Sequence, residues 1–385
     1  MAQAIPDADA WRKRAAKIRA NILRGAKLEH LPPPCPLNPV VHSRRELDGY
    51  NVANVAFDAL PGFRVTGNLY TPSNPTDSMP GILIAHGHWE NGRRQEPTQK
   101  LAASLARMGA TLFAWDMLGF GESTQCDHKH PEGLRIQTYS SMRALDFLLS
   151  QPGVDAERLA ITGASGGGTQ TFILAAIDDR IDVSVPVVQV SAHFYGGCTC
   201  ESGMPIHVCD GIETNNVEIA ASFAPKPQLL VSDGDDWTAN TPQVEFPYIR
   251  RIYGLLGAED NVENAHFPDE GHDYGPSKRK AVYKFLAKHL KLNLAGVQDA
   301  AGEIDESFVT ILDLEELAAL DGVHAPPGQA LTDCQEVVRL LDEAYRESAH
   351  TNPEKSRGRR GDKLQSHSIG NNIRPSLQFR LRAEP

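Results

Sequence analysis

The chain has 385 residues, of which 41% are hydrophobic and 23% charged, as in ordinary globular proteins, so it can bury a large core in one or two domains. Its formal net charge of −11 argues against nucleic acid or an anionic membrane as the main partner. No apolar run approaches the length of a membrane span, and no signal peptide is visible. We therefore expect a cytoplasmic protein, or a secreted or periplasmic one whose leader was removed.

The N-terminal part predicts a helix followed by a pair of strands. Residues 8–28 place apolar side chains at helical spacing between lysines and arginines, which is typical of an amphipathic helix docked on a domain. The proline-rich segment LPPPCPLNP then breaks the helix. Residues 51–60 and 64–72 alternate like two strands joined by a tight Pro-Gly turn.

The centre of the chain changes to short apolar runs separated by helical segments. Helices are expected around 99–108, through 140–150, directly after the glycines that follow residue 163, and over 277–292. Runs bounded by turns and separated by helices indicate a parallel sheet that is buried on both faces. The runs lie at 81–87, 110–116, 158–163, 183–191 and 228–234.

These patterns predict four segments. Residues 1–40 form an N-terminal helix and arm, and residues 41–295 form an α/β domain with a mostly parallel central sheet flanked by helices. Residues 296–345 form a helical extension, with short helices near Leu312–Leu320 and Leu331–Tyr345. Residues 346–385 are polar, basic and poor in large apolar side chains, and we expect a flexible tail there.

The segment GASGG places Ser165 within a G-x-S-x-G pattern. A predicted strand precedes it and a predicted helix follows, which is the setting of a nucleophile elbow, where a strained turn raises the serine hydroxyl above the sheet edge. Glycines flank the serine because side chains there would collide across so tight a turn. The alternative, a phosphate-binding glycine loop, requires a lysine partner that the segment lacks.

A nucleophilic serine needs a base, an orienting acid and an oxyanion hole. His272 lies in a loop before the closing helix and is the candidate base, whereas His266 lies in a strand-like stretch and is expected to be structural. The acid is Asp235 or Asp236, which follow the last apolar run, with Glu201 as the rival.

The oxyanion hole requires backbone N–H groups close to the serine. Gly166 follows the serine and should supply one of them. The other should come from His88 or Trp89, in the loop after the first apolar run of the parallel sheet.

From about residue 50 to 292 the chain resembles α/β-hydrolases, and within them the bacterial acetyl-xylan-esterase-like and dienelactone-hydrolase-like enzymes. The resemblance is carried by HGHWENGR (86–93), AWDMLGFGES (114–123), the segment 141–171, SDGDDWT (232–238) and DEGHDYG (269–275). It implies an α/β-hydrolase fold with Ser165 as nucleophile, Asp236 as orienting acid and His272 as base. One departure is the long polar segment 192–211, which contains Glu201.

The function expected is hydrolysis of a carboxylic ester through an acyl-enzyme, with no cofactor. By resemblance the substrate is an acetylated carbohydrate or another small ester. Arg93 is a candidate clamp for a carboxylate or sugar hydroxyls, and Trp237 and Glu201 are further candidates for substrate contact. The alternatives are a lactonase or peptidase with the same triad, or a binding protein that kept the fold. The oligomeric state stays open.

The six cysteines are not expected to form a disulfide framework in a chain of this length. Cys198, Cys200 and Cys209 lie close together with His207 between them, which raises the possibility of zinc. Structural zinc sites usually use C-x₂₋₄-C spacing, and C-x-C lacks it. We therefore expect no metal, and instead buried thiols or a local disulfide.

Overall fold

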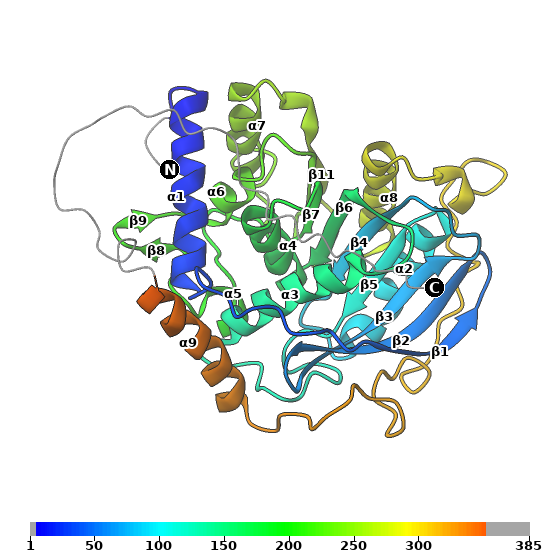
Figure 1. The fold of residues 1–385 in the computed structure, drawn as a ribbon. Helices are drawn as coiled ribbons and strands as arrows, with labels where there is room; N and C mark the ends of the chain where they lie inside the picture. The colour runs from blue at the N-terminus through cyan, green and yellow to red at the C-terminus, as the bar shows by residue number, and fades with distance from the viewer. Residues whose placement is uncertain (1–4, 352–385) are drawn as a thin grey trace, which may run out of the picture.

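The computed structural model describes residues 5–351, and the last 34 residues of the predicted basic tail lie outside this range. The described chain forms one nine-stranded mixed sheet with helices on both faces (Figure 1). No described helix is both long and apolar enough to cross a membrane. The helices are α1 (Ala8–Gly25), α2 (Glu96–Arg107), α3 (Gly133–Leu149), α4 (Gly166–Ile177), α5 (Thr199–Ser202), α6 (Asn216–Ala221), α7 (Glu245–Leu255), α8 (Pro276–Leu290) and α9 (Cys334–Thr351).

The sheet has an antiparallel beginning and a parallel body. Its strand order is β1-β2-β3-β5-β4-β6-β7-β10-β11, and every pair from β5 to β11 is parallel. The carboxyl ends of those strands therefore meet at one edge of the sheet. The strands are β1 (Val40–Glu46), β2 (Tyr50–Leu60), β3 (Phe63–Pro72), β4 (Met79–Ala85), β5 (Thr111–Trp115), β6 (Val154–Ala164), β7 (Val183–Val187), β10 (Gln228–Asp233) and β11 (Val262–Phe267), with a separate small hairpin of β8 (Val208–Cys209) and β9 (Ile212–Glu213).

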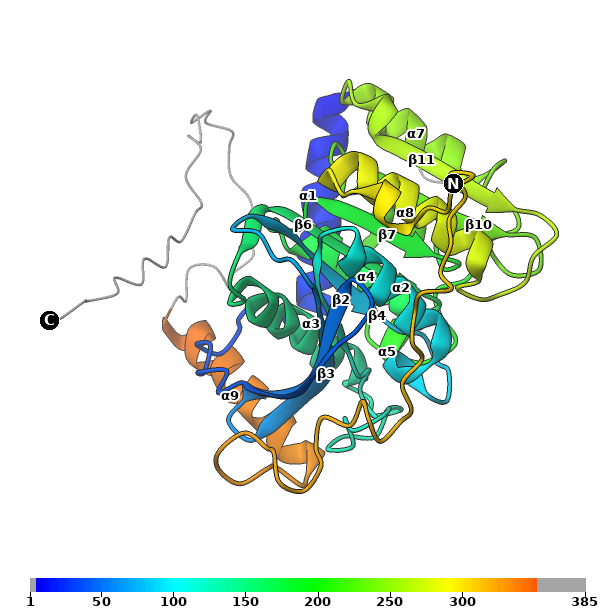
Figure 2. The ribbon, with the colours of Figure 1, turned by 90° about the vertical axis from the view of Figure 1, so that its right-hand side faces the viewer.

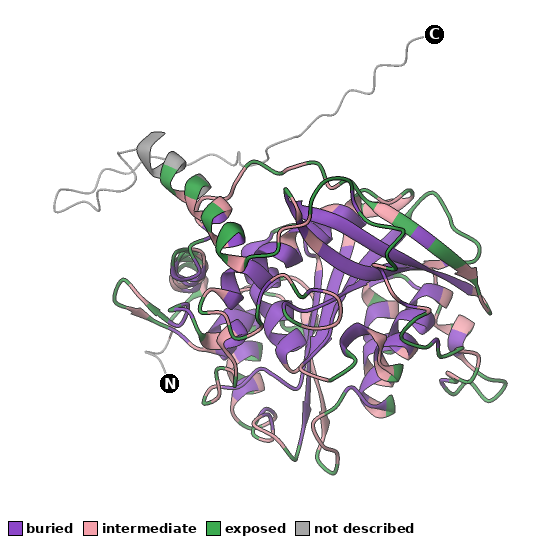
Figure 3. Ribbon diagram, turned by 90° about the horizontal axis from the view of Figure 1, so that it is seen from below, coloured by how far each residue is buried: buried purple, intermediate pink, exposed green. Residues whose placement is uncertain are grey.

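Two apolar cores lie on the two faces of this sheet. α3 and α4 pack on one face, with α1 packed against α4, while α2 and α8 pack on the other (Figures 1 and 2). The strands β4, β5, β7 and β10 are buried along their whole length, which explains why they read as continuous apolar runs (Figure 3). The α/β fold predicted from those runs, with its N-terminal helix, is confirmed.

The short helix predicted near Leu312–Leu320 is wrong. This segment has no regular structure, although Leu312, Leu317 and Ala319 are buried. Side chains of the sheet and of the loop after β4 donate to several of its backbone carbonyls, as Asn54 does to the carbonyls of Glu316 and Ala318. Only isolated hydrogen bonds join N–H groups and carbonyls within the segment, so tertiary contacts take the place of a regular helical ladder.

A disulfide joins Cys126, in the loop between β5 and α3, to Cys334 at the start of α9, 208 residues later. α9 also packs Val337 and Leu341 into the core that covers α3. Arg135 of α3 reinforces this contact through an ion pair with Asp342 at 2.6 Å. No local pattern in the sequence predicts this pairing, because the two cysteines are 208 residues apart.

Candidate active site

Ser165 lies at the sharp turn between β6 and α4, at the carboxyl edge of the sheet. Its backbone angles are φ 58° and ψ −126°, a region that costs a residue other than glycine about 1–3 kcal/mol. The turn is tight enough to require glycine on both sides. A Cβ at Gly163 would lie 2.4 Å from the carbonyl oxygen of Ala85, and one at Gly167 would lie 2.1 Å from the same atom. The structure thus holds Ser165 in the conformation of a nucleophile elbow.

Asp236 and His272 come together from the loops that follow β10 and β11, which are neighbouring parallel strands. His272 Nδ1 lies 2.6 Å from Asp236 Oδ2. A carboxylate oxygen only accepts, so Nδ1 carries the proton and Nε2 has a free lone pair. Burial alone would raise the pKa of Asp236, but hydrogen bonds from His272 and Thr238 outweigh it and lower that pKa. An ionised Asp236 therefore orients the His272 ring as a base requires.

Among the residues that the structure describes, the Ser165 hydroxyl has no hydrogen-bond partner, and its side chain is partly exposed. In free serine hydrolases the hydrogen bond between nucleophile and base often tightens only when substrate binds. The catalytic roles of Ser165, Asp236 and His272 therefore stay predictions.

Two indole rings flank the half-exposed imidazole of His272. The centroid of the Trp237 ring lies 4.6 Å from that of His272, and the Trp89 centroid lies 6.1 Å from it. Phe194 stacks on Trp237 at 4.1 Å. The rings form an apolar wall beside the imidazole, and the substrate contact expected of Trp237 stays a prediction.

Lys278 of α8 holds the loop that carries His272, a role that the sequence analysis missed. Its ammonium group is fully buried, and it donates to the Gly271 carbonyl at 2.5 Å and to Asp273 Oδ1 at 2.7 Å. It also pairs with the buried Asp233 at 3.2 Å. The only local signal was a lysine early in the predicted helix 277–292, which is ordinarily a solvent-facing residue.

The loop after β4 lies against the serine turn, where an oxyanion hole would form. The Trp89 N–H donates to the Gly87 carbonyl at 2.9 Å, so Trp89 is not a free backbone donor and that alternative is wrong. The N–H groups of His88 and of Gly166, the first residue of α4, remain as candidates. His88 lies directly beside Gly166, since a Cβ there would be 2.5 Å from Cε1 of the His88 ring.

Glu201 is not positioned as the orienting acid. One of its carboxylate oxygens accepts from Thr169 and Gln189, and the other accepts from the Gly197 N–H at 3.0 Å. The side chain is buried, and burial raises its pKa. Glu201 therefore supports the turn after Ser165, and a buried side chain whose two oxygens are both hydrogen-bonded is not positioned for the predicted substrate contact. Asp235, the other rival acid, is exposed.

The predicted clamp at Arg93 is wrong. Its side chain is fully buried and pairs with Asp116 at 3.0 Å and with Glu122 at 2.6 Å. Its guanidinium also donates to the Leu317 carbonyl at 3.0 Å. Arg93 therefore joins the C-terminal segment to the domain and has no free face toward a substrate. The sequence could not show this, because its partners come from distant segments.

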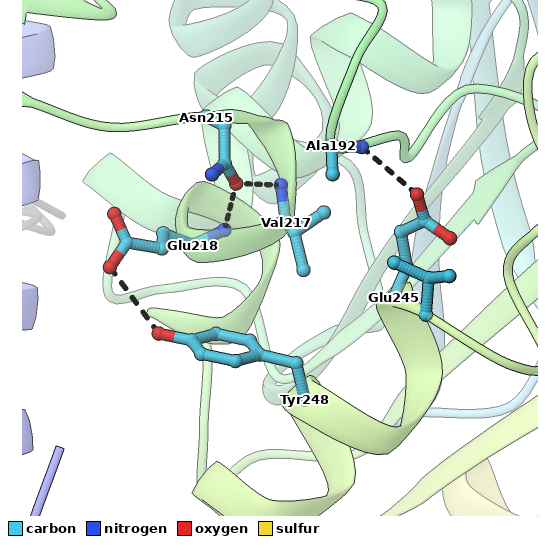
Figure 4. Close-up of a pocket in the computed structure, with 7 residues that line it drawn as sticks. Ala192, Asn215, Val217, Glu218, Glu245 and Tyr248 are labelled. Carbon is cyan, nitrogen blue, oxygen red and sulfur yellow. Dashed lines mark hydrogen bonds between the residues drawn. The ribbon is translucent and has the colours of Figure 1, made fainter. Parts of the chain in front are cut away.

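His266 lies on β11 and its Nδ1 is 2.9 Å from the Ser232 hydroxyl, which fits the structural role expected of it. A small cavity between α6 and α7 is lined by neither Ser165, Asp236 nor His272 (Figure 4). Hydrogen bonds within the protein occupy much of its polar lining, among them Tyr248 to Glu218. We therefore assign no substrate to this cavity.

Comparison with known proteins places this geometry in a family, although no family model matches the chain. The structure is similar to that of methylesterase BT1017, with 38% sequence identity, a TM-score of 0.80 and coverage of 90% of this chain and 78% of that one. It also resembles a glucuronoyl esterase from Solibacter usitatus, with 17% identity and a TM-score of 0.55 over 74% of this chain and 95% of that one, a similarity of fold alone.

Curated relatives match shorter stretches. The 4-O-methyl-glucuronoyl methylesterase of Neurospora crassa is 24% identical over 208 residues, 46% of this chain and 51% of the relative. The Bacillus subtilis protein YtaP is 28% identical over 144 residues, 32% of this chain and 48% of the relative. The chain thus spans about half the length of these relatives. The match along most of its length to methylesterase BT1017 shows that the chain belongs to the α/β-hydrolase-fold esterases related to that enzyme.

Proposed function

We propose that the protein hydrolyses a carboxylic ester of a carbohydrate, with Ser165 as nucleophile, His272 as base and Asp236 as orienting acid. The observation that supports this most is the Asp236–His272 hydrogen bond of 2.6 Å beside a serine at positive φ. In the proposed reaction Ser165 attacks the ester carbonyl and His272 Nε2 takes its proton. The imidazolium then protonates the departing alcohol, and water, activated by the same imidazole, releases the acyl group.

The developing negative charge on the carbonyl oxygen needs two donors. The Gly166 N–H and the His88 N–H are proposed for this role, because both lie at the turn and neither has an acceptor among the described residues. Removing one such donor costs about 10²–10³ in kcat in enzymes of this kind. Backbone donors cannot be deleted by side-chain substitution, so they are best probed by a transition-state analogue.

The ester type is proposed from the relatives. A methylesterase at 38% identity favours a methyl ester, and the 4-O-methyl-glucuronoyl methylesterase of Neurospora crassa favours a sugar acid as its acyl part. In the hydrolysis of such an ester methanol leaves and the sugar carboxylate becomes the acyl group. Acetylated carbohydrate, the expectation from sequence, is the second candidate. The aromatic wall formed by Trp89 and Trp237 suits the apolar face of a sugar ring in either case.

The test compares methanol release from methyl esters of uronic acids with acetate release from acetylated xylo-oligosaccharides, using the whole chain. A kcat/KM at least tenfold higher on the methyl esters supports the first assignment, and the reverse order supports the second. Labelling by a fluorophosphonate probe, lost in Ser165→Ala, tests the nucleophile independently of substrate. No hydrolysis and no labelling would overturn the proposal.

The cellular location is also a proposal. The Cys126–Cys334 disulfide is of the kind that persists in oxidising compartments, and this favours the secreted or periplasmic alternative over the cytoplasm. Fractionation of cells that express the native gene, with the redox state of Cys334 measured in each fraction, tests it.

A further inference from the structure

Two histidines and two cysteines from three distant segments meet beside the serine turn. His88 follows β4, His128 lies in the loop between β5 and α3, and Cys198 and Cys200 lie at the start of α5. Their ligand atoms all lie within 4.8 Å of one another. We propose that these four side chains, here called the Cys₂His₂ cluster, bind a zinc ion that holds the loops around the candidate active site.

The spacing within the cluster is close to that of a tetrahedral site. The Cys200 sulfur lies 3.2 Å from His88 Nε2 and 3.4 Å from His128 Nε2. Zinc bonds of about 2.0–2.1 Å to nitrogen and 2.3 Å to sulfur put neighbouring ligand atoms about 3.6 Å apart. An outward movement of a few tenths of an ångström therefore makes room for the ion between these atoms.

The protonation of His128 suits a metal ligand. Its Nδ1 lies 2.6 Å from the Leu118 carbonyl oxygen, which can only accept, so the proton is on Nδ1. Nε2 then presents its lone pair to Cys200. Histidines that bind metals commonly donate their second N–H to a backbone carbonyl in this way, which fixes the ring.

Two imidazole nitrogens face the sulfur of Cys200, which is fully buried. A thiol makes only weak hydrogen bonds, whereas its thiolate is a strong zinc ligand. A zinc ion accepts an electron pair from each of the four side chains at once. Two thiolates and two neutral imidazoles are a ligand set that zinc prefers, and four protein ligands leave no open position. The site is therefore structural.

The proposed zinc site would position residues of the candidate active site without contacting the substrate itself. The His88 ring lies against Gly166, and the His88 N–H is a proposed oxyanion donor. Cys200 precedes Glu201, whose carboxylate accepts from Thr169 in the first turn of α4. A metal at the cluster would fix both sides of the serine turn.

This inference differs from the sequence-based expectation of no metal. That expectation considered Cys198, Cys200 and Cys209 with His207 between them, whereas His207 is hydrogen-bonded to Asn216 and Cys209 lies in β8. The two histidines of the cluster precede Cys200 by 112 and 72 residues, so the C-x-C spacing alone could not reveal the site. Cys198, Cys200 and Cys209 are free thiols here, not a local disulfide.

The experiment measures zinc in the whole chain, purified without a chelator or a metal-affinity tag. We expect about one zinc per chain in the wild type and in the matched control Cys209→Ser, whose thiol is free but outside the cluster. The double variant Cys198→Ser with Cys200→Ser should hold less than about a tenth of that amount.

A spectroscopic measurement on the wild-type chain covers the case in which the double variant does not fold. Cobalt exchanged for zinc should show thiolate charge-transfer absorption and the intense d–d bands of a tetrahedral site, and Cys209→Ser should keep them. Wild-type protein that neither contains zinc nor takes up cobalt would overturn the proposal. So would a Cys198–Cys200 disulfide found by mass spectrometry, or full zinc content in the folded double variant.

Discussion

Replacing Asp236 by asparagine changes only the group that faces Nδ1 of His272, the proposed base. This substitution is therefore the sharpest test of the proposed triad. Asp236 Oδ1 accepts from the Thr238 N–H at 2.6 Å and from its hydroxyl at 2.5 Å, while Oδ2 faces His272 Nδ1. In the variant the amide oxygen keeps the two Thr238 donors, so the NH₂ group is directed at His272. Nδ1 must then accept, the proton moves to Nε2, and the ring can no longer take the serine proton.

The expected loss in kcat is about 10⁴-fold, because the ring is held in the wrong tautomer while its place is unchanged. At about 1.36 kcal/mol for each factor of ten, this amounts to about 5.4 kcal/mol of transition-state stabilisation. KM should change little, since the carboxylate does not contact substrate in the proposed mechanism. The assay measures kcat and KM on one ester, beside the controls Asp235→Asn and Glu201→Gln. An Asp236→Asn enzyme that keeps more than a tenth of wild-type kcat, or a larger loss in Glu201→Gln, would refute the assignment.

The same pair also predicts a pH dependence of stability. The pKa of Asp236 is lowered below its ordinary value of 3.8, so the carboxylate stabilises the fold above that pH. This contribution is lost as the pH falls through the lower folded-state pKa. Urea unfolding between pH 5 and 2 should therefore show a larger loss of unfolding free energy in the wild type than in Asp236→Asn. Parallel curves for the two proteins would contradict the pKa shift.

Three further outcomes are expected. Ser165→Gly should abolish hydrolysis yet raise the unfolding free energy by up to about 1 kcal/mol, because glycine relieves the positive φ. Ser165→Ala should lose activity without this gain in stability. Equal unfolding free energies of the two variants would mean that the turn is unstrained. Cys334→Ser should lower the unfolding free energy by up to about 5 kcal/mol, the loop-closure term for the 208-residue separation from Cys126, and reductant should have no further effect on this variant. Arg93→Met leaves the buried Asp116 without its partner and should lower the unfolding free energy, measured in urea, by about 3–5 kcal/mol. The KM of the folded protein should stay unchanged. A raised KM with normal stability would instead support the hypothesis that Arg93 binds substrate.

Features that depend on neighbouring residues can be predicted from the amino-acid sequence alone. The apolar runs with helices between them indicate a parallel sheet, because a strand buried on both faces must be apolar throughout. Ser165 stands out because the stereochemistry of a tight turn demands glycines next to it. The loop positions of Asp236 and His272 follow from chain order, since parallel strands bring their carboxyl ends to one edge.

Which side chains meet across those loops depends on the three-dimensional packing of the chain and could not be predicted from the sequence. Asp235 and Asp236 are adjacent in sequence, and the direction of the turn after β10 alone separates the exposed carboxylate from the one that faces His272. Arg93 reads as an exposed cation, yet its carboxylate partners and the Leu317 carbonyl enclose it. The two histidines of the Cys₂His₂ cluster lie 112 and 72 residues before Cys200, and the disulfide joins Cys126 to Cys334, 208 residues apart. Such contacts leave no periodic or local pattern, because they depend on how the loops pack on one another at the sheet edge and around α3 and α9.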